Sequence, residues 1–265
     1  MTSLSGHHAV ITGGGTGIGA AIARALASEG ARITLVGRRL GPLEEVAAQI
    51  RSSRAKSRDP IERSRDTDAN GIQVTSADVT DRSQVDAAFS LAREAQGTIT
   101  ILVNNAGAAA GIPFAKVTPE IWRDMLAVNL DGMFHCCHAA LPDLLAAQAG
   151  RIVTIASMAG LHGFAYASPY IAAKHGAVGL TRALAAEFAQ KRLRVNAVCP
   201  GFVDTDMTVQ SVSNIAAKTG RSEDSAREEL ARLNPSGRLI SPDEVAAAVL
   251  DLVHSDRNGE AVEIA

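Results

Sequence analysis

Residues 8–28 read HAVITGGGTGIGAAIARALAS, which is a short apolar run, a run rich in glycine, and a stretch whose apolar residues recur at helical spacing. The apolar run His8–Ile11 predicts a strand, and Ala20–Ser28 predicts the helix that follows it. Strand, glycine turn and helix in this order place the pyrophosphate of a dinucleotide at a helix N-terminus. The glycines allow a tight turn and a close approach of phosphates to the backbone. This stretch therefore predicts a dinucleotide-binding α/β fold.

Strands and helices alternate along the rest of the chain, which predicts a single domain over residues 1–265 with one doubly wound parallel sheet. Further strands are expected at Arg32–Val36, Ile72–Thr75, Ile99–Val103, Arg151–Ala156, Arg194–Val198 and Ala261–Ile264, and helices at Leu43–Ile50, Ser83–Gln96 and Pro242–His254. The functional site of such a sheet lies at the carboxyl edge of its strands.

Two segments depart from this regular alternation. Arg51–Gly71 is dense in Ser, Arg and Asp and poor in apolar residues, which predicts a mobile, solvated insertion without a catalytic role. Residues 204–236 follow the sixth predicted strand and predict two helices that form a lid over the substrate, because segments at this edge act as lids in many enzymes.

The composition limits the classes of protein that this chain can belong to. It has 265 residues and a formal net charge of -2, which gives no reason to expect nucleic acid or a membrane as a partner. No apolar run reaches the roughly 18–20 residues of a membrane span, and the first ten residues lack the pattern of a signal peptide. The 3 cysteines do not form a disulfide framework, so we expect a reducing, cytoplasmic setting.

The stretch Ser157–Lys174 (SMAGLHGFAYASPYIAAK) carries a hydroxyl, a phenol and an ammonium. With Pro169 in the first turn of a helix, Tyr170 and Lys174 lie at i and i+4 on one helical face. A cation beside a phenol lowers its pKa from about 10 toward the range of a general acid at neutral pH. Ser157 follows a predicted strand and would donate a hydrogen bond to the same substrate oxygen. Alternatively, Tyr-x-x-x-Lys is an ordinary pair on a helix surface.

Other motifs decide between these alternatives. Together with Asn129, the residues Ser157, Tyr170 and Lys174 resemble the catalytic set of the short-chain dehydrogenase/reductase family. Three more motifs stand around them in the family's order, namely Thr12–Gly19 (TGGGTGIG), Asn104–Gly107 (NNAG) and Pro200–Gly201. The resemblance covers nearly the whole chain. Within the family, the sequence NAVCPGFVDTDM and the segment after it are most similar to polyketide-type ketoreductases and 3-hydroxyacyl-thioester dehydrogenases.

The resemblance implies reversible hydride transfer between a nicotinamide and a carbonyl carbon. In that reaction Tyr170 gives its proton to the developing alkoxide, and Lys174 lowers the Tyr170 pKa and holds the nicotinamide ribose. Ser157 stabilises the oxyanion, and Asn129 kinks its helix and supports a proton relay. Substrate contacts are expected from Ser157, His162, Phe164 and Met207.

The family's cofactor contacts carry over to matching positions of this chain. They are Gly13, Thr16, Gly17, Ile18, Gly19, Arg38, Arg39, Asp78, Val79, Asn105, Ala106, Gly107, Tyr170, Lys174, Pro200, Gly201, Val203 and Thr205. Many dinucleotide folds end the second strand with an acid that binds the ribose 2′-hydroxyl, whereas this chain has Gly37, Arg38 and Arg39 there. Guanidinium groups can hold a 2′-phosphate, which favours NADP(H), with NAD(H) as the alternative. The arginines are otherwise solvated surface charges.

Two alternatives concern single motifs. Asp78, assigned to the adenine, can equally be a helix cap. The segment His135-Cys136-Cys137-His138 carries a His pair that could face a metal, but we find no companion ligands in the sequence. We therefore expect helix packing there and no metal.

Three functions are compatible with the sequence. The first, which we expect, is NADPH-dependent reduction of a small-molecule ketone such as a 3-ketoacyl thioester or a cyclic ketone. The second is NAD-dependent oxidation of a secondary alcohol in a degradative pathway. The third is a non-catalytic nicotinamide-binding sensor, although such proteins usually lose the hydroxyl, the phenol or the lysine. The family also implies a homo-oligomer, either a tetramer or a dimer, that assembles through its long helices.

Overall fold

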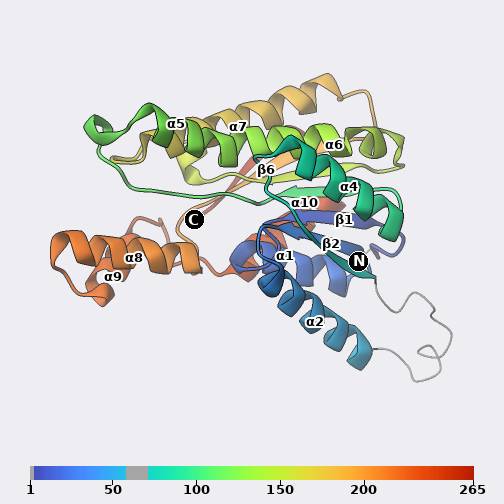
Figure 1. Ribbon diagram of the computed structural model, residues 1–265, viewed down its shortest axis with the longest axis horizontal. Helices are drawn as coiled ribbons and strands as arrows, with labels where there is room; N and C mark the ends of the chain where they lie inside the picture. Colours follow the sequence, from blue (N-terminus) through green and yellow to red (C-terminus); the bar gives the residue numbers. More distant parts are fainter. Residues whose placement is uncertain (1–2, 58–70) are drawn as a thin grey trace.

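The computed structural model of the chain describes residues 3–57 and 71–265. Its centre is an all-parallel, 7-stranded sheet in the order β3-β2-β1-β4-β5-β6-β7, with helices on both faces (Figure 1). The strands are β1 (His8–Thr12), β2 (Arg32–Gly37), β3 (Ile72–Ser76), β4 (Ile101–Asn104), β5 (Arg151–Ile155), β6 (Arg194–Pro200) and β7 (Ala261–Ile264). The predicted doubly wound parallel sheet is therefore confirmed.

The helices divide between the two faces of the sheet. Their bounds are α1 (Gly17–Ser28), α2 (Leu40–Ser57), α4 (Arg82–Gln96), α5 (Pro119–Leu126), α6 (Gly132–Ala146), α7 (Ser168–Glu187), α8 (Asp206–Thr219), α9 (Glu223–Arg232) and α10 (Pro242–His254). Helices α1, α2 and α10 share one apolar core with the sheet, and α4, α6 and α7 share the other. A π-helical turn, η2 (Ala127–Asp131), joins α5 to α6. Two 3-10 turns, η1 (Phe114–Lys116) and η3 (Met158–Gly160), follow β4 and β5.

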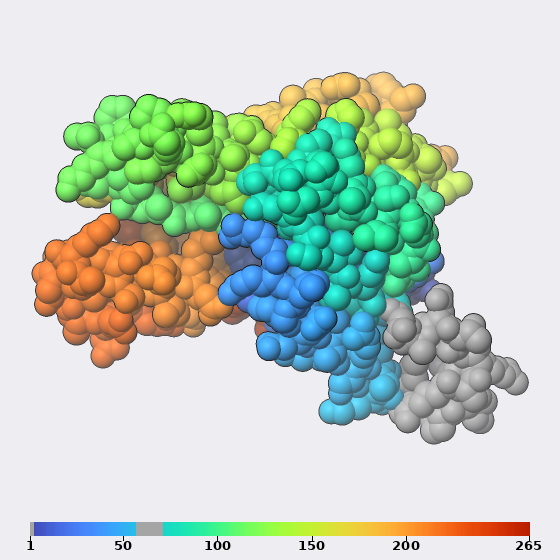
Figure 2. Space-filling model, viewed as in Figure 1, coloured from blue at the N-terminus to red at the C-terminus, as the bar shows by residue number. Residues whose placement is uncertain are grey.

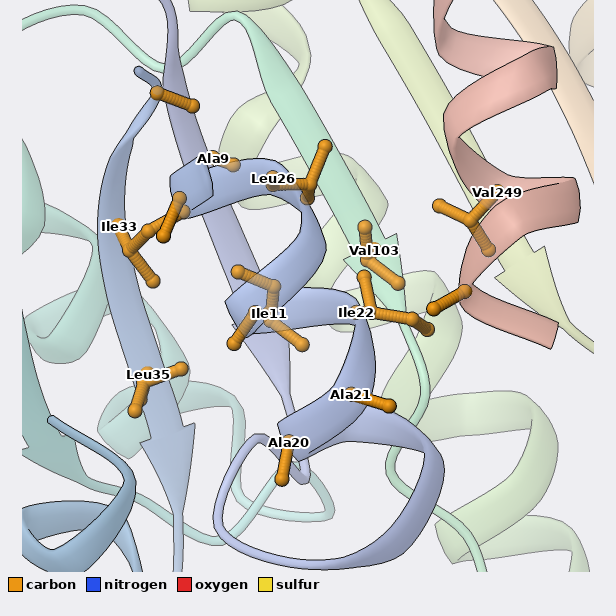
Figure 3. Close-up of a cluster of buried hydrophobic side chains, with 14 of the residues drawn as sticks. Ala9, Ile11, Ala20, Ala21, Ile22, Leu26, Ile33, Leu35, Val103 and Val249 are labelled. Carbon is orange, nitrogen blue, oxygen red and sulfur yellow. The ribbon is translucent and has the colours of Figure 1, made fainter. Parts of the chain in front are cut away.

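The strand order reverses between β1 and β4, which creates the crevice where such sheets bind ligands. From β1 the chain runs outward to β2 and β3, then returns to pair β4 with the other side of β1. Ile11 of β1 therefore lies between Leu35 of β2 and Val103 of β4. Figure 3 shows Ile22 and Leu26 of α1 covering this part of the sheet. This buried apolar pairing fixes the register of β1, β2 and β4, so that the three strands end at the same edge of the sheet.

Helices α8 and α9 extend beyond the two main layers (Figures 1 and 2). They pack on each other through a small apolar cluster of their own, made by Val212, Ala226 and Leu230 with Phe202 and Ile215 against it. The two helices expected after the sixth strand are therefore present. Figure 2 shows a crevice between this pair of helices and the segment that carries α5.

One boundary prediction was wrong. We expected an irregular segment from Arg51 onward, but α2 continues to Ser57. Its last turns are held by Arg54, whose guanidinium donates to the backbone carbonyls of Gly71 (3.2 Å), Ala27 (3.3 Å) and Ala31. These contacts anchor a polar helix end that burial alone would not hold. The remainder of the expected insertion, residues 58–70, lies outside the described residues.

Within the described part of the chain, no helix combines the length and the apolar character that crossing a membrane requires. The same residues contain no group of three or more His, Cys, Asp or Glu side chains arranged to hold a metal ion.

A buried histidine in β1 makes the stability of the fold depend on pH. His8 is fully buried, with Nδ1 2.8 Å from the Gly97 carbonyl oxygen and Nε2 2.9 Å from the Thr34 hydroxyl. Burial lowers the pKa of His8 from 6.5 to about 4, against the opposing effect of the Gly97 carbonyl. Below about pH 6.5, His8 is therefore protonated in the unfolded chain, whereas in the folded chain it stays neutral down to about pH 4.

We therefore predict that acid weakens the fold through His8. Between pH 6.5 and 5, this residue should remove about 2 kcal/mol from the free energy of unfolding, since one pKa unit corresponds to about 1.4 kcal/mol. Urea denaturation at several pH values measures this quantity in the wild type and in His8→Val, with the exposed His175→Gln as control. Equal pH slopes for wild type and His8→Val would contradict the prediction.

Candidate active site

The glycine turn after β1 has the backbone that a phosphate site requires. Gly13 (φ 64°) and Gly17 (φ 51°) lie in the left-handed region, and a Cβ on Gly19 would come within 2.3 Å of the Gly13 carbonyl oxygen. Thr16 precedes α1 without a side-chain cap, and the first turn of α1 has no acidic residue. The N-terminal N–H groups of α1 therefore suit an anion.

The turn after β4 is interlocked with this glycine turn. The Thr12 hydroxyl oxygen accepts from the backbone N–H groups of Asn105 (3.0 Å) and Ala106 (3.0 Å). In return, the Asn105 side-chain amide donates to the carbonyl oxygens of Thr12 (3.0 Å) and Gly13 (3.1 Å). A Cβ on Gly107 would lie 2.8 Å from Asn129 Oδ1, so a side chain there would displace the Asn129 amide. These contacts join the two turns that flank the crevice.

The arginines after β2 stand in solvent at the same edge of the sheet. Arg38 and Arg39 are both exposed, and the Arg38 guanidinium lies 3.9 Å from an Asp78 carboxylate oxygen, with its side chain 76% exposed. Asp78 accepts from the N–H (3.0 Å) and hydroxyl (2.8 Å) of Thr80. The cap of α4 is Asp81. The alternative interpretation of Asp78 as a helix cap is therefore wrong.

Val79 is held from helix α6. The His135 ring Nδ1 lies 2.9 Å from the Val79 carbonyl oxygen and donates to it. A Cβ on Gly132 would come within 2.7 Å of the Val79 side chain, so glycine is needed for this approach. The turn of Asp78 and Val79, which the resemblance assigns to the adenine, is therefore held by α6 as well as by α4.

The fold brings Ser157, Tyr170 and Lys174 together at the ends of β5 and α7. Ser157 follows β5 after one residue, and Pro169 stands in the first turn of α7, as the sequence predicted. Lys174 is buried, and its ammonium donates to the Ile155 carbonyl oxygen (2.9 Å) and lies 5.7 Å from the centre of the Tyr170 ring. Lys174 of the predicted i, i+4 pair is buried and Tyr170 is partly buried, so the two do not form an ordinary surface pair.

Burial governs the electrostatics of this pair. It raises the pKa of Tyr170 above its usual value, while the Ser157 hydroxyl in hydrogen-bonding contact acts to lower it. Burial also lowers the pKa of Lys174 to about 8. The Tyr170 pKa is therefore shifted in the opposite direction to the one that the sequence predicted, because burial outweighs the groups that would lower it. The Ser157 hydroxyl is the group that favours the phenolate.

Asn129 stands in the π-helical turn η2, so the predicted interruption of the helix is present. Its side-chain amide donates to the carbonyl oxygens of Ala108 (2.9 Å) and Met125 (3.0 Å), and its Oδ1 accepts from the Ala108 N–H (3.3 Å). The extra residue in the turn takes the backbone out of the regular i→i−4 pattern. Asn129 is thereby a fully satisfied buried amide that ties η2 to the loop after β4.

A small polar cavity lies between Asn129 and Lys174. Its volume is about 10 Å³, enough for a single water molecule, and its polar lining includes Thr12, Asn104 and Thr154. The Asn104 carboxamide oxygen is buried there without a partner in the described residues. The proton relay assigned to Asn129 stays a prediction.

The loop after β6 closes the opposite side of the crevice. Pro200 ends β6, and the loop continues through Gly201 and Val203 to Thr205 at the start of α8. A Cβ on Gly17 would lie 3.1 Å from the Thr205 methyl group, so this loop faces the glycine turn directly. The structure thus places the predicted cofactor contacts around one crevice.

The three predicted substrate contacts besides Ser157 are less closely defined. Phe164 is 37% exposed and Met207 is 45% exposed. His162 lies 3.8 Å from a Glu263 carboxylate oxygen of β7, a partner that the sequence did not suggest. Their roles toward a substrate stay predictions.

The His135–His138 segment is part of the packing of α6. Cys136 and Cys137 are buried, and burial raises the pKa of the Cys137 thiol to about 12, which disfavours the thiolate that metals bind. His135 is bound to the Val79 carbonyl, and His138 lies 3.0 Å from the Arg82 guanidinium.

Sequence reasoning missed the contacts of three buried or partly buried residues around this site, namely Thr12, His135 and Asn234. Thr12 carried a local signal, because it stands at the boundary between strand and glycine turn. His135 and Asn234 carried none, since their partners are 56 and 32 positions away in the sequence. Asn234 precedes Pro235, which indicates only a turn.

Comparison with known proteins agrees with this geometry. Residues 7–216 match the family described as short chain dehydrogenase. A protein of Streptomyces violaceoruber, named as a ketoacyl reductase of the granaticin polyketide synthase, is 38% identical over 94% of this chain and 86% of its own length. A D-beta-hydroxybutyrate dehydrogenase of Cupriavidus necator is 35% identical over 94% of this chain and 91% of its own. The crystal structure of a single-residue variant of actinorhodin polyketide ketoreductase with NADPH superposes with a TM-score of 0.88 at 31% identity, covering 100% of this chain and 97% of that one.

The chain belongs to the short chain dehydrogenase family. It is an NAD(P)-dependent oxidoreductase that acts on CH–OH groups and ketones. The uncapped N-terminus of α1 and the glycine turn before it fit the pyrophosphate of a dinucleotide.

The unusual titration of Lys174 is directly measurable. We predict that its ammonium loses its proton near pH 8, whereas solvated lysines do so above about pH 10. Because the depressed pKa comes from burial, the charged form should predominate only below about pH 8. NMR titration of ¹³C-labelled lysine side chains measures this, and Lys174→Arg identifies the resonance. Titration of every lysine signal above pH 10 would contradict the assignment.

Proposed function

We propose that the chain reduces ketones with NADPH, and that its substrate is a 3-ketoacyl thioester or a cyclic ketone. The observation that carries the cofactor choice is the pair Arg38 and Arg39, which directly follows β2 in place of the acid that many dinucleotide folds carry there. The similar structure whose title names NADPH, and the Streptomyces relative named for ketoacyl reduction, support the same choice.

The proposed mechanism assigns one task to each of four residues. Tyr170 donates its phenolic proton to the carbonyl oxygen as that oxygen gains charge, and the Ser157 hydroxyl donates a hydrogen bond to the same oxygen. Lys174 holds the ribose of the cofactor and supplies positive charge. Asn129 lines the cavity through which the proton that Tyr170 gives up is replaced. A bound nicotinamide cofactor supplies the hydride. Because burial raises the Tyr170 pKa, the phenol is protonated and ready to donate at neutral pH.

Oxidation of a secondary alcohol with NAD is the second candidate. It is favoured by the Cupriavidus relative, whose name describes a hydroxybutyrate dehydrogenase. In that direction Tyr170 must give up its proton first, so the raised pKa makes the oxidation depend more strongly on alkaline conditions.

The lid and the assembly are also proposals. Residues 204–236 include α8 and α9, and we propose that they cover the substrate from the side of the crevice seen in Figure 2. Helix α6 and its neighbour α5 expose Phe134, Leu145 and Trp122, a surface that suits a second copy of the chain in a dimer or tetramer.

The proposed mechanism predicts a graded loss of activity. Ser157→Ala should fold, bind NADPH and lose about 10²–10³ in kcat, the usual effect of removing an oxyanion donor. Tyr170→Phe should lose more, because it removes the proton itself. Steady-state rates with a cyclic ketone and a 3-ketoacyl thioester measure both effects, and NADPH fluorescence confirms that the variants still bind. Near-wild-type turnover by Tyr170→Phe would contradict the mechanism.

The cofactor proposal predicts a selective loss of affinity. Arg38→Ala should bind NADPH at least about tenfold more weakly and NADH nearly unchanged, because only NADPH carries the charged phosphate. Fluorescence titration with both cofactors measures this, and Arg232→Ala, which removes an exposed arginine of α9, is the control. Equal or better binding of NADH by the wild type would instead favour alcohol oxidation.

A further inference from the structure

Asn234 is a buried amide whose hydrogen-bonding groups are all directed at backbone. It lies between α9 and α10 and is 2% exposed. Its Oδ1 accepts from the Phe202 N–H (2.8 Å), and its Nδ2 donates to the carbonyl oxygens of Phe202 (2.9 Å) and Arg238 (2.6 Å). The side chain thus pairs with both polar groups of Phe202 as a neighbouring strand would.

The Asn234 amide also lies close to Gly201. A Cβ at Gly201 would lie 2.2 Å from Asn234 Oδ1 and 3.1 Å from the Met158 sulfur. The loop after β6 is therefore enclosed between Asn234 on one side and the residue next to Ser157 on the other. Any shift of the amide would move this loop relative to the catalytic hydroxyl.

Asn234 also connects the two ends of the α8–α9 segment, because it lies where the segment ends and binds Phe202 close to where it begins. This segment leaves the sheet after Thr205 and returns at Asn234. The Phe202 side chain packs on the apolar cluster of α8 and α9, while its backbone is bound by Asn234 and by the Ile240 N–H (3.0 Å). Phe202 is consequently the point where the helices meet the loop after β6.

We propose that Asn234 is a positioning residue for hydride transfer. It fixes the backbone of residues 201–205, and through them the nicotinamide half of the cofactor, relative to Tyr170 and Ser157. The inference rests on the proposed function and deepens it: the cofactor contacts that the resemblance assigns to Gly201, Val203 and Thr205 of this loop are taken as contacts to the nicotinamide half. A misplacement of about 1 Å at a reacting centre can cost about 100-fold in rate, so a residue that touches neither substrate nor cofactor can matter this much.

The chain contains a matched control in Asn196 of β6. Asn196 is 1% exposed, its Oδ1 accepts from the Glu260 N–H (3.0 Å), and its Nδ2 donates to the Arg257 carbonyl oxygen (2.8 Å). This amide clamps backbone in the same way, but it does so next to β7, away from the crevice. If Asn234 only held backbone in place, its loss should therefore have the same consequences as the loss of Asn196.

The test compares Asn234→Leu with Asn196→Leu. Both variants leave buried backbone groups without partners, so both should melt at a lower temperature. Only Asn234→Leu should bind reduced nicotinamide mononucleotide about tenfold more weakly. Its affinity for whole NADPH should change less than about threefold, since the adenosine half keeps its contacts. Its kcat should fall about 10- to 100-fold, with a larger primary isotope effect from NADPH deuterated at C4.

A folded Asn234→Leu that matches Asn196→Leu in mononucleotide affinity, kcat and isotope effect would overturn the proposal. If the leucine variant does not fold, Asn234→Asp keeps the acceptor for the Phe202 N–H and loses both donors. It should show an intermediate loss of mononucleotide affinity, and unchanged affinity would overturn the proposal equally. Mononucleotide binding needs no ketone, so a wild type without turnover would reject the proposed function and leave this test intact.

Discussion

The hydrogen bonds between Asn105 and the Thr12–Gly13 turn are the contacts on which the rest of the site depends. They join the ends of β1 and β4 at the point where the strand order reverses. On one side of this junction the glycines open the N-terminus of α1 to an anion. On the other side the loop after β4 bonds to Asn129 and thereby sets the π-helical turn beside Lys174. A single pair of interlocked turns therefore sets the distance between the two halves of the crevice.

Burial is the second constraint, and it acts in opposite directions on the two groups that titrate. It raises the pKa of Tyr170 and lowers that of Lys174, because in each case it acts against the charged form. A bound dinucleotide would bring negative charge and ribose hydroxyls to this place. Such a ligand would favour the charged form of Lys174.

Local patterns were enough to predict the sheet, the glycine turn and the helix that carries Tyr170 and Lys174. Each of these features depends on residues close together in the sequence, such as Pro169 at the start of α7. Features that depend on distant partners were not predictable. The Arg54 guanidinium holds the last turns of α2 by donating to backbone carbonyl oxygens outside that helix, such as that of Gly71. Asn234 binds the backbone of Phe202, which lies 32 positions earlier in the sequence. The direction of the Tyr170 pKa shift also required the structure, because it follows from burial rather than from the spacing of the lysine.

The central claim is that this crevice transfers hydride to a ketone. The most direct test supplies the protein with NADPH deuterated at C4 and a mixture of cyclic ketones and 3-ketoacyl thioesters, and follows the products by mass spectrometry. The account predicts an alcohol that carries one deuterium on its carbinol carbon. NADPH that binds tightly and yields no deuterated alcohol from any member of either ketone class would contradict it.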